Sequence, residues 1–151
     1  MRSISYVSSY SYCVFSTKVR RSLITAQLRE RLWPFLGGIA RENKMKALSI
    51  GGVANHVHLL ISLPATMPIA KAMQLIKGGS SKWMHETFQD QRLFAWQNKN
   101  GAFSVSVSQL DGIIKYIKIR KSITAKMSFQ EEFIALLKKH NIEYDDRYLW
   151  E

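Results

Sequence analysis

The stretch from Asn55 to Pro64, NHVHLLISLP, decides how the rest of the chain is interpreted. Its run of apolar residues and histidines, closed by the proline, predicts a β-strand over 56–63. Because a strand turns successive side chains to opposite faces, His56 and His58 should project from one face, about 6 to 7 Å apart. Two imidazoles at this spacing can bind one divalent ion. The alternative is a half-buried pair that neighbouring groups satisfy.

The predicted strand has an expected partner just before it. The pair Gly51-Gly52 predicts a turn, and a short strand at 47–50 should lie beside 56–63. Similar patterns predict the other elements: strands at 6–16, 94–96 and 102–107, and helices at 26–43, 69–88, 109–126 and 129–140. This order predicts an α+β sandwich in which helices pack on an antiparallel sheet.

Capping residues mark the predicted helix starts. Thr25 and Ser108 are placed to cap the first and third helices, and Pro68 precedes the second. Ser128 is placed to cap the fourth helix, with Glu131 completing a capping box. Four aromatic residues are expected to lie in the core rather than to stack on bases: Trp83, Phe94, Trp96 and Phe103.

The 151 residues carry a formal net charge of +11, which is divided unevenly along the chain. Residues 1–130 hold 19 basic and 5 acidic side chains, a net charge of +14, whereas residues 131–151 hold 3 basic and 6 acidic, a net charge of −3. A body this basic favours a polyanionic partner, since neutralised phosphates release counterions and supply affinity that is independent of sequence. Nucleic acid is therefore the first candidate, ahead of an acidic membrane surface.

The composition also bounds the organisation of the chain. No repeat or linker divides the sequence and 46% of its residues are hydrophobic, so residues 1–151 should form one domain, with 128–151 as a C-terminal helix and an acidic, aromatic tail. Cys13 has no second cysteine to pair with and is expected to be buried, in a reducing compartment. No signal-peptide core or membrane span is visible, and a cytoplasmic location is expected.

A second candidate site lies on the third predicted helix. Tyr116 and Arg120 lie four residues apart, away from the apolar side of this helix. The lysines around them are Lys115, Lys118, Lys121 and Lys126. These cations would favour the phenolate and hold a phosphate, so Tyr116 could attack a phosphodiester. The alternative is an ordinary surface tyrosine on an amphipathic helix.

Several stretches, in the same order along the chain, resemble one family. They are HVHLLI at 56–61, KGGSSKW at 77–83, FAW at 94–96, GAFSVS at 101–106, YI at 116–117 and RYLW at 147–150. Together they resemble the small HUH single-tyrosine transposases, which the simplest bacterial insertion sequences encode, and the related REP-associated tyrosine transposases. The resemblance extends from about Tyr10 to Glu151 and is more specific than any single motif.

This resemblance implies a ferredoxin-like domain that acts on single-stranded DNA with hairpin structure, as a homodimer. His56 and His58 would hold a Mg²⁺ or Mn²⁺ ion that polarises the scissile phosphate, and Tyr116 would attack that phosphate. The products would be a 5′-phosphotyrosyl enzyme and a free 3′-hydroxyl, which can later rejoin strands. The resemblance also implies that the tyrosine helix of one subunit serves the histidine pair of the other.

The chain departs from the family pattern near this expected site. Arg120 stands where the family usually has a glutamine that completes the metal site, and a guanidinium cannot be a ligand. Asn55 replaces a common aspartate, and Tyr12 replaces a histidine often found in the first strand. Either Arg120 supplies its charge directly to the phosphate, or the chain has lost cleavage and retains DNA binding. Gln109 or Asp111 is a further option for the third ligand.

Basic side chains along the chain are candidates for DNA contact: Lys18, Arg20, Arg21, Lys77, Lys82, Arg120 and Lys121. The first three follow the first strand, where the alternative is a solvated basic turn. Lys77 and Lys82 flank the pair Gly78-Gly79, and a glycine inside a helix costs about 1 kcal/mol relative to alanine. Close approach of DNA phosphates to Ser80 and Ser81, or close helix packing, would account for the two glycines.

Three functions are consistent with these residues. The leading hypothesis is a transposase that cleaves and rejoins single-stranded transposon ends through Tyr116. The second is a protein of the same fold that binds structured single-stranded DNA or RNA without cleaving it. The third is a metal-dependent nuclease in which His56 and His58 activate water and Tyr116 takes no part.

Overall fold

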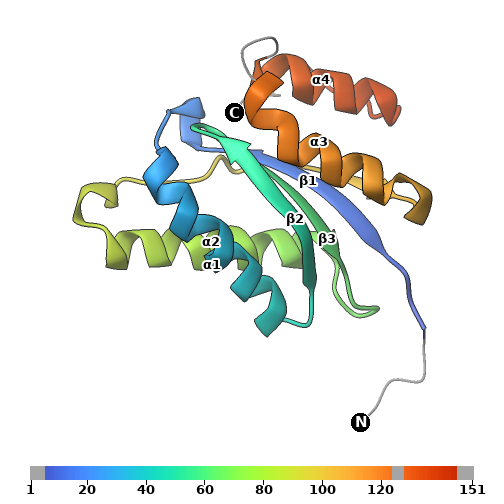
Figure 1. Ribbon diagram of the computed structural model, residues 1–151, viewed down its shortest axis with the longest axis horizontal. Helices are drawn as coiled ribbons and strands as arrows, with labels where there is room; N and C mark the ends of the chain where they lie inside the picture. Colours follow the sequence, from blue (N-terminus) through green and yellow to red (C-terminus); the bar gives the residue numbers. More distant parts are fainter. Residues whose placement is uncertain (1–5, 124–127, 146–151) are drawn as a thin grey trace.

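The structure, a computed structural model, describes residues 6–123 and 128–145, without the side chains of 119–123. Within these residues four antiparallel strands form one sheet with helices on both faces (Figure 1). The strands are β1 (Tyr10–Ser16), β2 (Lys46–Val53), β3 (His56–Ser62) and β4 (Gly101–Val105), in the spatial order β2-β3-β1-β4. The helices are α1 (Ala26–Glu42), α2 (Ile69–Thr87), α3 (Leu110–Ile123) and α4 (Phe129–Lys139). This is the predicted α+β sandwich, a ferredoxin-like βαββαβ unit followed by two helices.

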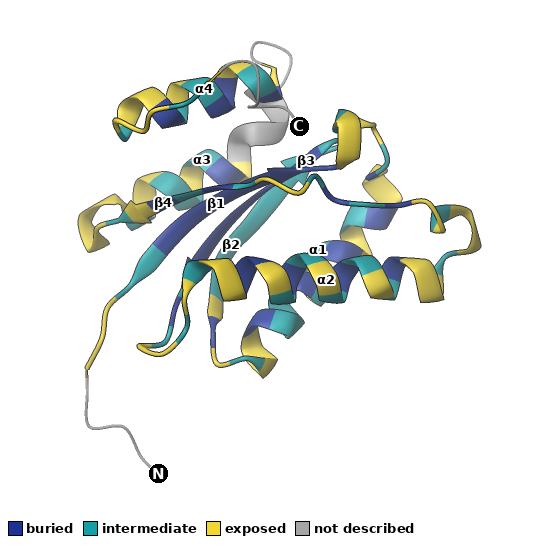
Figure 2. Ribbon diagram, turned by 180° about the vertical axis from the view of Figure 1, so that it is seen from behind, coloured by how far each residue is buried: buried dark blue, intermediate teal, exposed yellow. Residues whose placement is uncertain are grey.

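Strand β3 divides the side chains of the sheet between two cores. It pairs with β1 on one side and with β2 on the other, which fixes its register. Leu59 and Ile61 lie in the core beneath α1 and α2. Leu60 lies in the second core, beneath α3 and α4, and the contacts of His56 and His58 with Glu132 of α4 place both histidines on that same side. Figure 2 shows α3 and α4 on one face of the sheet and α1 and α2 on the other. The histidine pair therefore faces the layer formed by the last two helices.

Strand β1, the other central strand, repeats this division. Tyr12 and Val14 belong to the core beneath α3 and α4, whereas Cys13 and Phe15 belong to the core beneath α1 and α2. The predicted burial of Cys13 is confirmed, and this burial raises the pKa of its thiol to about 12. The thiol is therefore uncharged at neutral pH and packs as a small apolar side chain.

The pair Gly51-Gly52 does not form the predicted turn. Both glycines lie inside β2, and the hairpin turns at Ala54-Asn55 instead. A Cβ atom on Gly51 would lie 2.7 Å from Cγ2 of Ile117 and 3.1 Å from its carbonyl oxygen, so glycine is what lets α3 approach the sheet. Gly52 has a φ angle of +148°, which other residues rarely adopt. The prediction was wrong because a glycine pair serves close backbone approach as well as turns.

The first strand begins later than predicted, at Tyr10, and residues 94–96 form no strand of their own. Trp96 makes one isolated bridge to Thr17, and the side chains of Phe94 and Trp96 are buried in the core beneath α1 and α2. The aromatic residues at 94–96 therefore indicate buried side chains in a loop and not a strand. Phe103 is also buried and Trp83 packs against the core, so the prediction that these four aromatic residues lie in the core is confirmed.

The helix starts follow their capping residues with one exception. Thr25 caps α1, and Ser128 caps α4 in a capping box with Glu131, as predicted. The cap before α3 is Ser106 rather than Ser108, because a short 3-10 turn precedes this helix. In the described part of the chain no helix combines the length and the apolar character needed to cross a membrane.

Gly79 and Ser80 inside α2 serve packing. A Cβ atom on Gly79 would lie 3.0 Å from Cδ1 of Ile39, so this glycine brings α2 close to α1. The hydroxyl of Ser80 is buried; it donates to the carbonyl of Ile76 at 2.6 Å and accepts from Nε1 of Trp96 at 2.9 Å. Of the two explanations for these glycines, close helix packing therefore holds for Gly79.

The contact between Gly51 and α3 predicts a stability effect. We expect Gly51→Ala to lower the free energy of unfolding by about 1–3 kcal/mol, because the added methyl group overpacks the interface with Ile117. Gly78 lies inside α2 with nothing within 4 Å of an added Cβ atom, and Gly78→Ala should raise that free energy by about 0.5–1 kcal/mol. Urea unfolding followed by circular dichroism measures both. Equal effects of the two substitutions would contradict the close contact of α3 with β2.

Candidate active site

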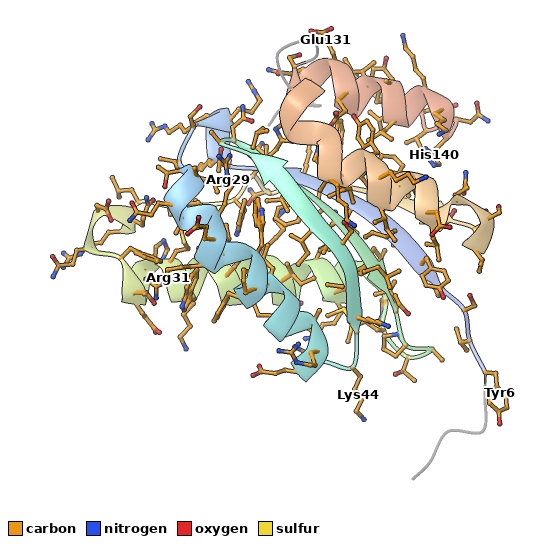
Figure 3. All side chains as sticks on the ribbon, viewed as in Figure 1. Tyr6, Arg29, Arg31, Lys44, Glu131 and His140 are labelled. Carbon is orange, nitrogen blue, oxygen red and sulfur yellow. The ribbon has the colours of Figure 1, made fainter. Side chains whose placement is uncertain are left out.

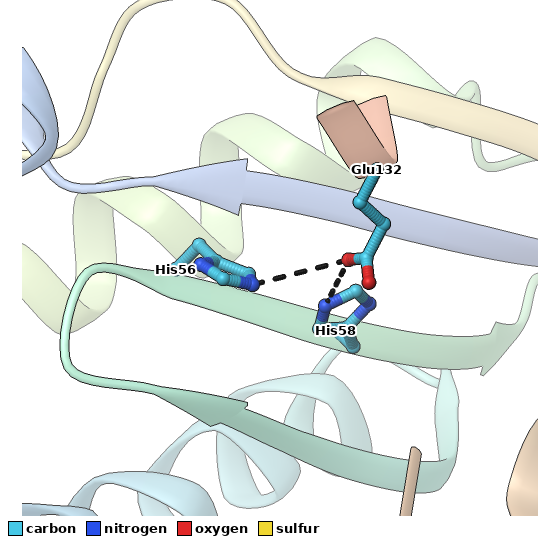
Figure 4. A group of neighbouring side chains, drawn as sticks. All are labelled: His56, His58 and Glu132. Carbon is cyan, nitrogen blue, oxygen red and sulfur yellow. Dashed lines mark ion pairs between the residues drawn. The ribbon is translucent and has the colours of Figure 1, made fainter. Parts of the chain in front are cut away.

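Three side chains from β3 and α4 converge on the side of the sheet that carries the last two helices (Figure 4). The Nε2 atom of His58 lies 2.7 Å from Oε1 of Glu132, and the Nε2 atom of His56 lies 3.9 Å from the same oxygen. The two imidazole rings are 5.1 Å apart between centroids. His56, His58 and Glu132 are only 2%, 0% and 4% exposed. Two imidazoles and one carboxylate thus meet in a nearly water-free place.

This group could hold a metal ion. One candidate ligand atom from each residue lies within 4.8 Å of the other two. Nε2 of His58 is buried and is not aligned for a hydrogen bond with any described group, Glu132 included. A buried polar atom without a hydrogen bond is costly, and an ion at this point would engage it. Two imidazole nitrogens and a carboxylate oxygen form a donor set that divalent transition metals accept.

The second ring nitrogen of each histidine is held by a neighbouring side chain. Nδ1 of His56 donates to Oδ1 of Asn55 at 2.7 Å, and Nδ2 of Asn55 in turn donates to the carbonyl of Arg20 at 3.5 Å. Nδ1 of His58 shares a 2.6 Å hydrogen bond with the hydroxyl of Tyr12. These contacts orient both rings so that each Nε2 faces Glu132. Asn55 and Tyr12, two departures from the family pattern, thus support the histidine pair.

Tyr116 of α3 belongs to the same cluster. Its ring stands edge-on to that of His58, with the centroids 6.1 Å apart, and its hydroxyl donates a short hydrogen bond to Oε2 of Glu132. Glu132 therefore contacts the histidines through one oxygen and the tyrosine through the other. All four residues come from one chain, so they meet without a second subunit. The sharing of sites between subunits stays a prediction.

The sequence analysis missed Glu132, although the chain carries a signal for it. This residue lies on the apolar stripe of α4, between Phe129 and Phe133 and one turn before Leu136, with both phenylalanines buried. A glutamate is rarely buried unless it is paired. A carboxylate on the buried face of an amphipathic helix is therefore a pattern that singles out functional residues.

The two options for a third ligand, Gln109 and Asp111, are exposed. Asp111 is not part of the metal-capable group of histidine and carboxylate side chains found among the described residues. The side chains of Arg120 and Lys121 lie outside the described residues. Their roles toward the phosphate and DNA stay predictions.

The basic residues that follow β1 lie next to the cluster. Lys18, Arg20 and Arg21 belong to a short 3-10 turn and its end, and the hydrogen bond from Asn55 joins this turn to the histidine end of β3. Lys82 is exposed on α2, which covers the opposite face of the sheet. The structure thus places the first group near the site and Lys82 away from it.

Lys77 has a structural role of its own. Its ammonium donates hydrogen bonds to the carbonyls of Gln97 and Asn98 at 2.6 and 3.2 Å, and to Oδ1 of Asn100 at 3.4 Å. Burial lowers the pKa of Lys77 to about 8. Lys77 therefore anchors the loop before β4, and any DNA contact through it has to compete with these hydrogen bonds.

Sequence comparison relates the chain to insertion-sequence proteins. Residues 5–120 match the family model described as "Transposase IS200 like". The transposases for insertion sequence element IS200 of Salmonella typhimurium and Salmonella typhi are each 27% identical to the chain over 88 residues. These matches cover 58% of this chain and 57% of each relative, so they span little more than half of the relatives' length.

Two solved structures share the fold. A Deinococcus radiodurans protein described as a transposase superposes with a TM-score of 0.65 at 21% identity, covering 78% of this chain and 95% of that one. A REP-associated tyrosine transposase bound to a REP hairpin superposes with a TM-score of 0.58 at 14% identity, covering 80% and 71%. At these identities the similarity establishes the architecture of the sheet and its helices.

The geometry of Glu132 predicts a defect in metal binding. We expect Mn²⁺ to bind the wild-type protein and to raise its Tm, since a ligand that binds only the folded state stabilises it. Glu132→Gln should weaken Mn²⁺ binding by at least about tenfold, because the charged oxygen beside both imidazoles is lost. Isothermal titration calorimetry measures the affinity. Glu131→Gln, at the adjacent exposed carboxylate, is the matched control, and equal losses in the two variants would contradict the site.

The lowered pKa of Lys77 predicts a pH dependence of stability. Because this pKa is about 8 in the folded protein and ordinarily 10.5 for a lysine in water, the folded state binds fewer protons between these values. The free energy of unfolding should therefore rise with pH from about 8 to 10.5. Lys77→Met removes this contribution, and urea unfolding of both proteins across that range measures the difference. A difference that stays constant with pH would contradict the prediction.

Proposed function

Because the chain belongs to the family of IS200-like transposases, we propose that it cleaves and rejoins single-stranded DNA at transposon ends through a covalent bond to Tyr116. The observation that carries this proposal is the carboxylate of Glu132, which contacts the tyrosine hydroxyl with one oxygen and the histidine pair with the other. Nucleophile, proton acceptor and candidate metal ligands are thereby adjacent. Such a cluster suits attack on a phosphodiester.

The proposed metal ligands are Nε2 of His56, Nε2 of His58 and Oε1 of Glu132. Mg²⁺ or Mn²⁺ is the proposed ion, since both accept carboxylate oxygen and engage phosphate oxygens. When bound, the ion would polarise the scissile phosphate as a Lewis acid. Asn55 and Tyr12 hold the imidazoles in the orientation that this ligation requires.

Glu132 also has a role toward the nucleophile. Its Oε2 already accepts the hydrogen bond from Tyr116, so it is within reach of the phenol proton. As the tyrosine oxygen bonds to phosphorus, the bond from phosphorus to the 3′ oxygen breaks. The phenol proton passes to Glu132 and the departing oxygen takes a proton from water. The products are a 5′-phosphotyrosine and a free 3′-hydroxyl.

Rejoining would use the same groups in reverse. A 3′-hydroxyl attacks the phosphotyrosine and gives its proton to water, and the tyrosine oxygen leaves with a proton returned by Glu132. The energy of the broken phosphodiester is conserved in the covalent bond to Tyr116, so no external energy source is needed. The glutamine that the family usually has near the metal could not take up this proton, whereas a carboxylate can.

The proposed substrate is a single strand that carries a hairpin. One structural neighbour is bound to a REP hairpin, and we extend that class of ligand to this chain. Lys18, Arg20 and Arg21 lie beside the histidine end of β3, where their charges would hold the phosphates that lead into the site. A homodimer is part of the same proposal.

One observation favours the second candidate function, binding without cleavage. His56 and His58 are 2% and 0% exposed. The ring centroids of Phe129 of α4 and His56 are 4.9 Å apart. A DNA phosphate therefore reaches the histidines only if side chains that cover them, such as Phe129, move aside. A chain in which this cover stayed in place would bind DNA through its basic residues and leave the strand intact.

A denaturing gel separates these functions. With a labelled hairpin-bearing strand and Mn²⁺, we expect a covalent protein–DNA band in the wild type and none in Tyr116→Phe. Glu132→Gln should form the band about 10²–10⁴ times more slowly, because the proton acceptor is lost. The control is Tyr144→Phe, at a half-buried tyrosine that packs against the core beneath α3 and α4. This variant should still form the covalent band.

The other outcomes of this experiment point to the competing functions. Cleavage without a covalent band would favour the nuclease that activates water. A salt-sensitive gel shift without cleavage would identify a binding protein.

A further inference from the structure

A cavity of about 510 Å³ lies beside Tyr116 and Glu132, between α3, α4 and β4. Its lining is mainly apolar and includes Val105, Ile113 and Leu136. Polar residues join this lining where the end of α4 lies near the start of α3, the region in which His140 is labelled (Figure 3). These polar residues are Gln109, Lys139 and His140. The cavity therefore combines apolar walls with a polar end, directly next to the proposed nucleophile.

We propose that this cavity binds the nucleobase of a nucleotide that adjoins the scissile phosphate. The inference rests on the proposed function, because Tyr116 and Glu132 belong to both sites. A strand attacked at Tyr116 brings its neighbouring base to within one nucleotide of the cavity. An unstacked base has flat apolar faces and a hydrogen-bonding edge, which match apolar walls and a polar end.

Gly112 leaves open space in the wall of the cavity. It lines the cavity and lies one helical turn before Tyr116, on the same face of α3. A Cβ atom at this position would meet nothing within 4 Å, so close packing does not require glycine here, in contrast to Gly51. A glycine inside a helix costs about 0.5–1 kcal/mol relative to alanine. The proposed base pocket gives this cost a use, since a glycine here leaves space beside the nucleophile.

The polar end of the cavity is held in place by local hydrogen bonds. Oε1 of Gln109 accepts from the backbone N–H of Ser106 at 3.0 Å, so the amide group of Gln109 can act toward a ligand as a donor. Nδ1 of His140 donates to the carbonyl of Leu136 at 2.9 Å, which makes the Nε2 atom of a neutral ring an acceptor. A fixed donor and a fixed acceptor are what recognition of a base edge requires, and Lys139 adds positive charge for the backbone.

Strands with single abasic sites test the proposal. Each nucleotide near the cleavage site is replaced in turn, and the initial rate of formation of the covalent band is measured with Mn²⁺. For the wild type we expect the rate to fall at least tenfold at one position that adjoins the cleaved phosphate, and less than twofold at positions farther away. The base at that position would then be the one that enters the cavity.

A variant with a filled cavity identifies where this base binds. Gly112→Phe places a side chain in the open space, and we expect it to slow cleavage of the intact strand at least tenfold while the abasic site costs less than a further twofold. Gly78→Phe, the same substitution at an open position of α2, is the matched control and should keep the wild-type pattern. If Gly112→Phe fails to fold by circular dichroism, Ala135→Phe fills the cavity from α4 and makes the same test.

The results that overturn the proposal are distinct from those that overturn the proposed function. Covalent cleavage with no dependence on any flanking base, or an undiminished dependence in the filled variants, overturns the base pocket and leaves the function standing. A change in oligomeric state in place of a change in base dependence would make the cavity a subunit interface and also overturns it. Absence of the covalent band with every strand overturns the proposed function, and this inference with it.

Discussion

The hydrogen bonding of β3 on both of its edges is the constraint on which the rest of the structure depends. Because β1 and β2 hold this strand in register, its alternate side chains are committed to opposite helix layers. A slip of one residue would move Leu59 and Ile61 out of the core beneath α1 and α2 and would bury the histidines there instead. The position of His56 and His58 beneath α4 therefore follows from the pairing of the sheet.

The buried carboxylate of Glu132 makes α4 part of both the core and the candidate site. Phe133 of this helix packs so closely on β4 that an added Cβ atom on Gly101 would lie 2.8 Å from its ring. Phe129, on the preceding turn, lies against the ring of His56. Burying a charge is costly unless partners compensate it, and here His58 and Tyr116 approach its two oxygens. The packing of Phe129 and Phe133 against the sheet thus also excludes water from the cluster of His56, His58 and Glu132.

Two departures from the family pattern lie at the histidine pair. Asn55 and Tyr12, which replace other residue types, both hold Nδ1 of a histidine. Glu132 supplies a carboxylate from a later helix, whereas Arg120 occupies the position where the family usually has a glutamine. Each imidazole of the pair therefore has a neighbouring side chain that holds its Nδ1 atom and orients its ring.

Short-range pattern by itself determined the two faces of β1 and β3, the shared face of the histidine pair, and the capping of α1 and α4. These features depend on residues two to four positions apart, which the sequence displays directly. Only the tertiary structure decided that Gly51 is a packing surface for Ile117, that Lys77 anchors the loop before β4, and that Glu132 joins the histidines. Each of these roles depends on a partner far away in the chain. Local periodicity does not report which distant segments the sheet and its helices bring into contact.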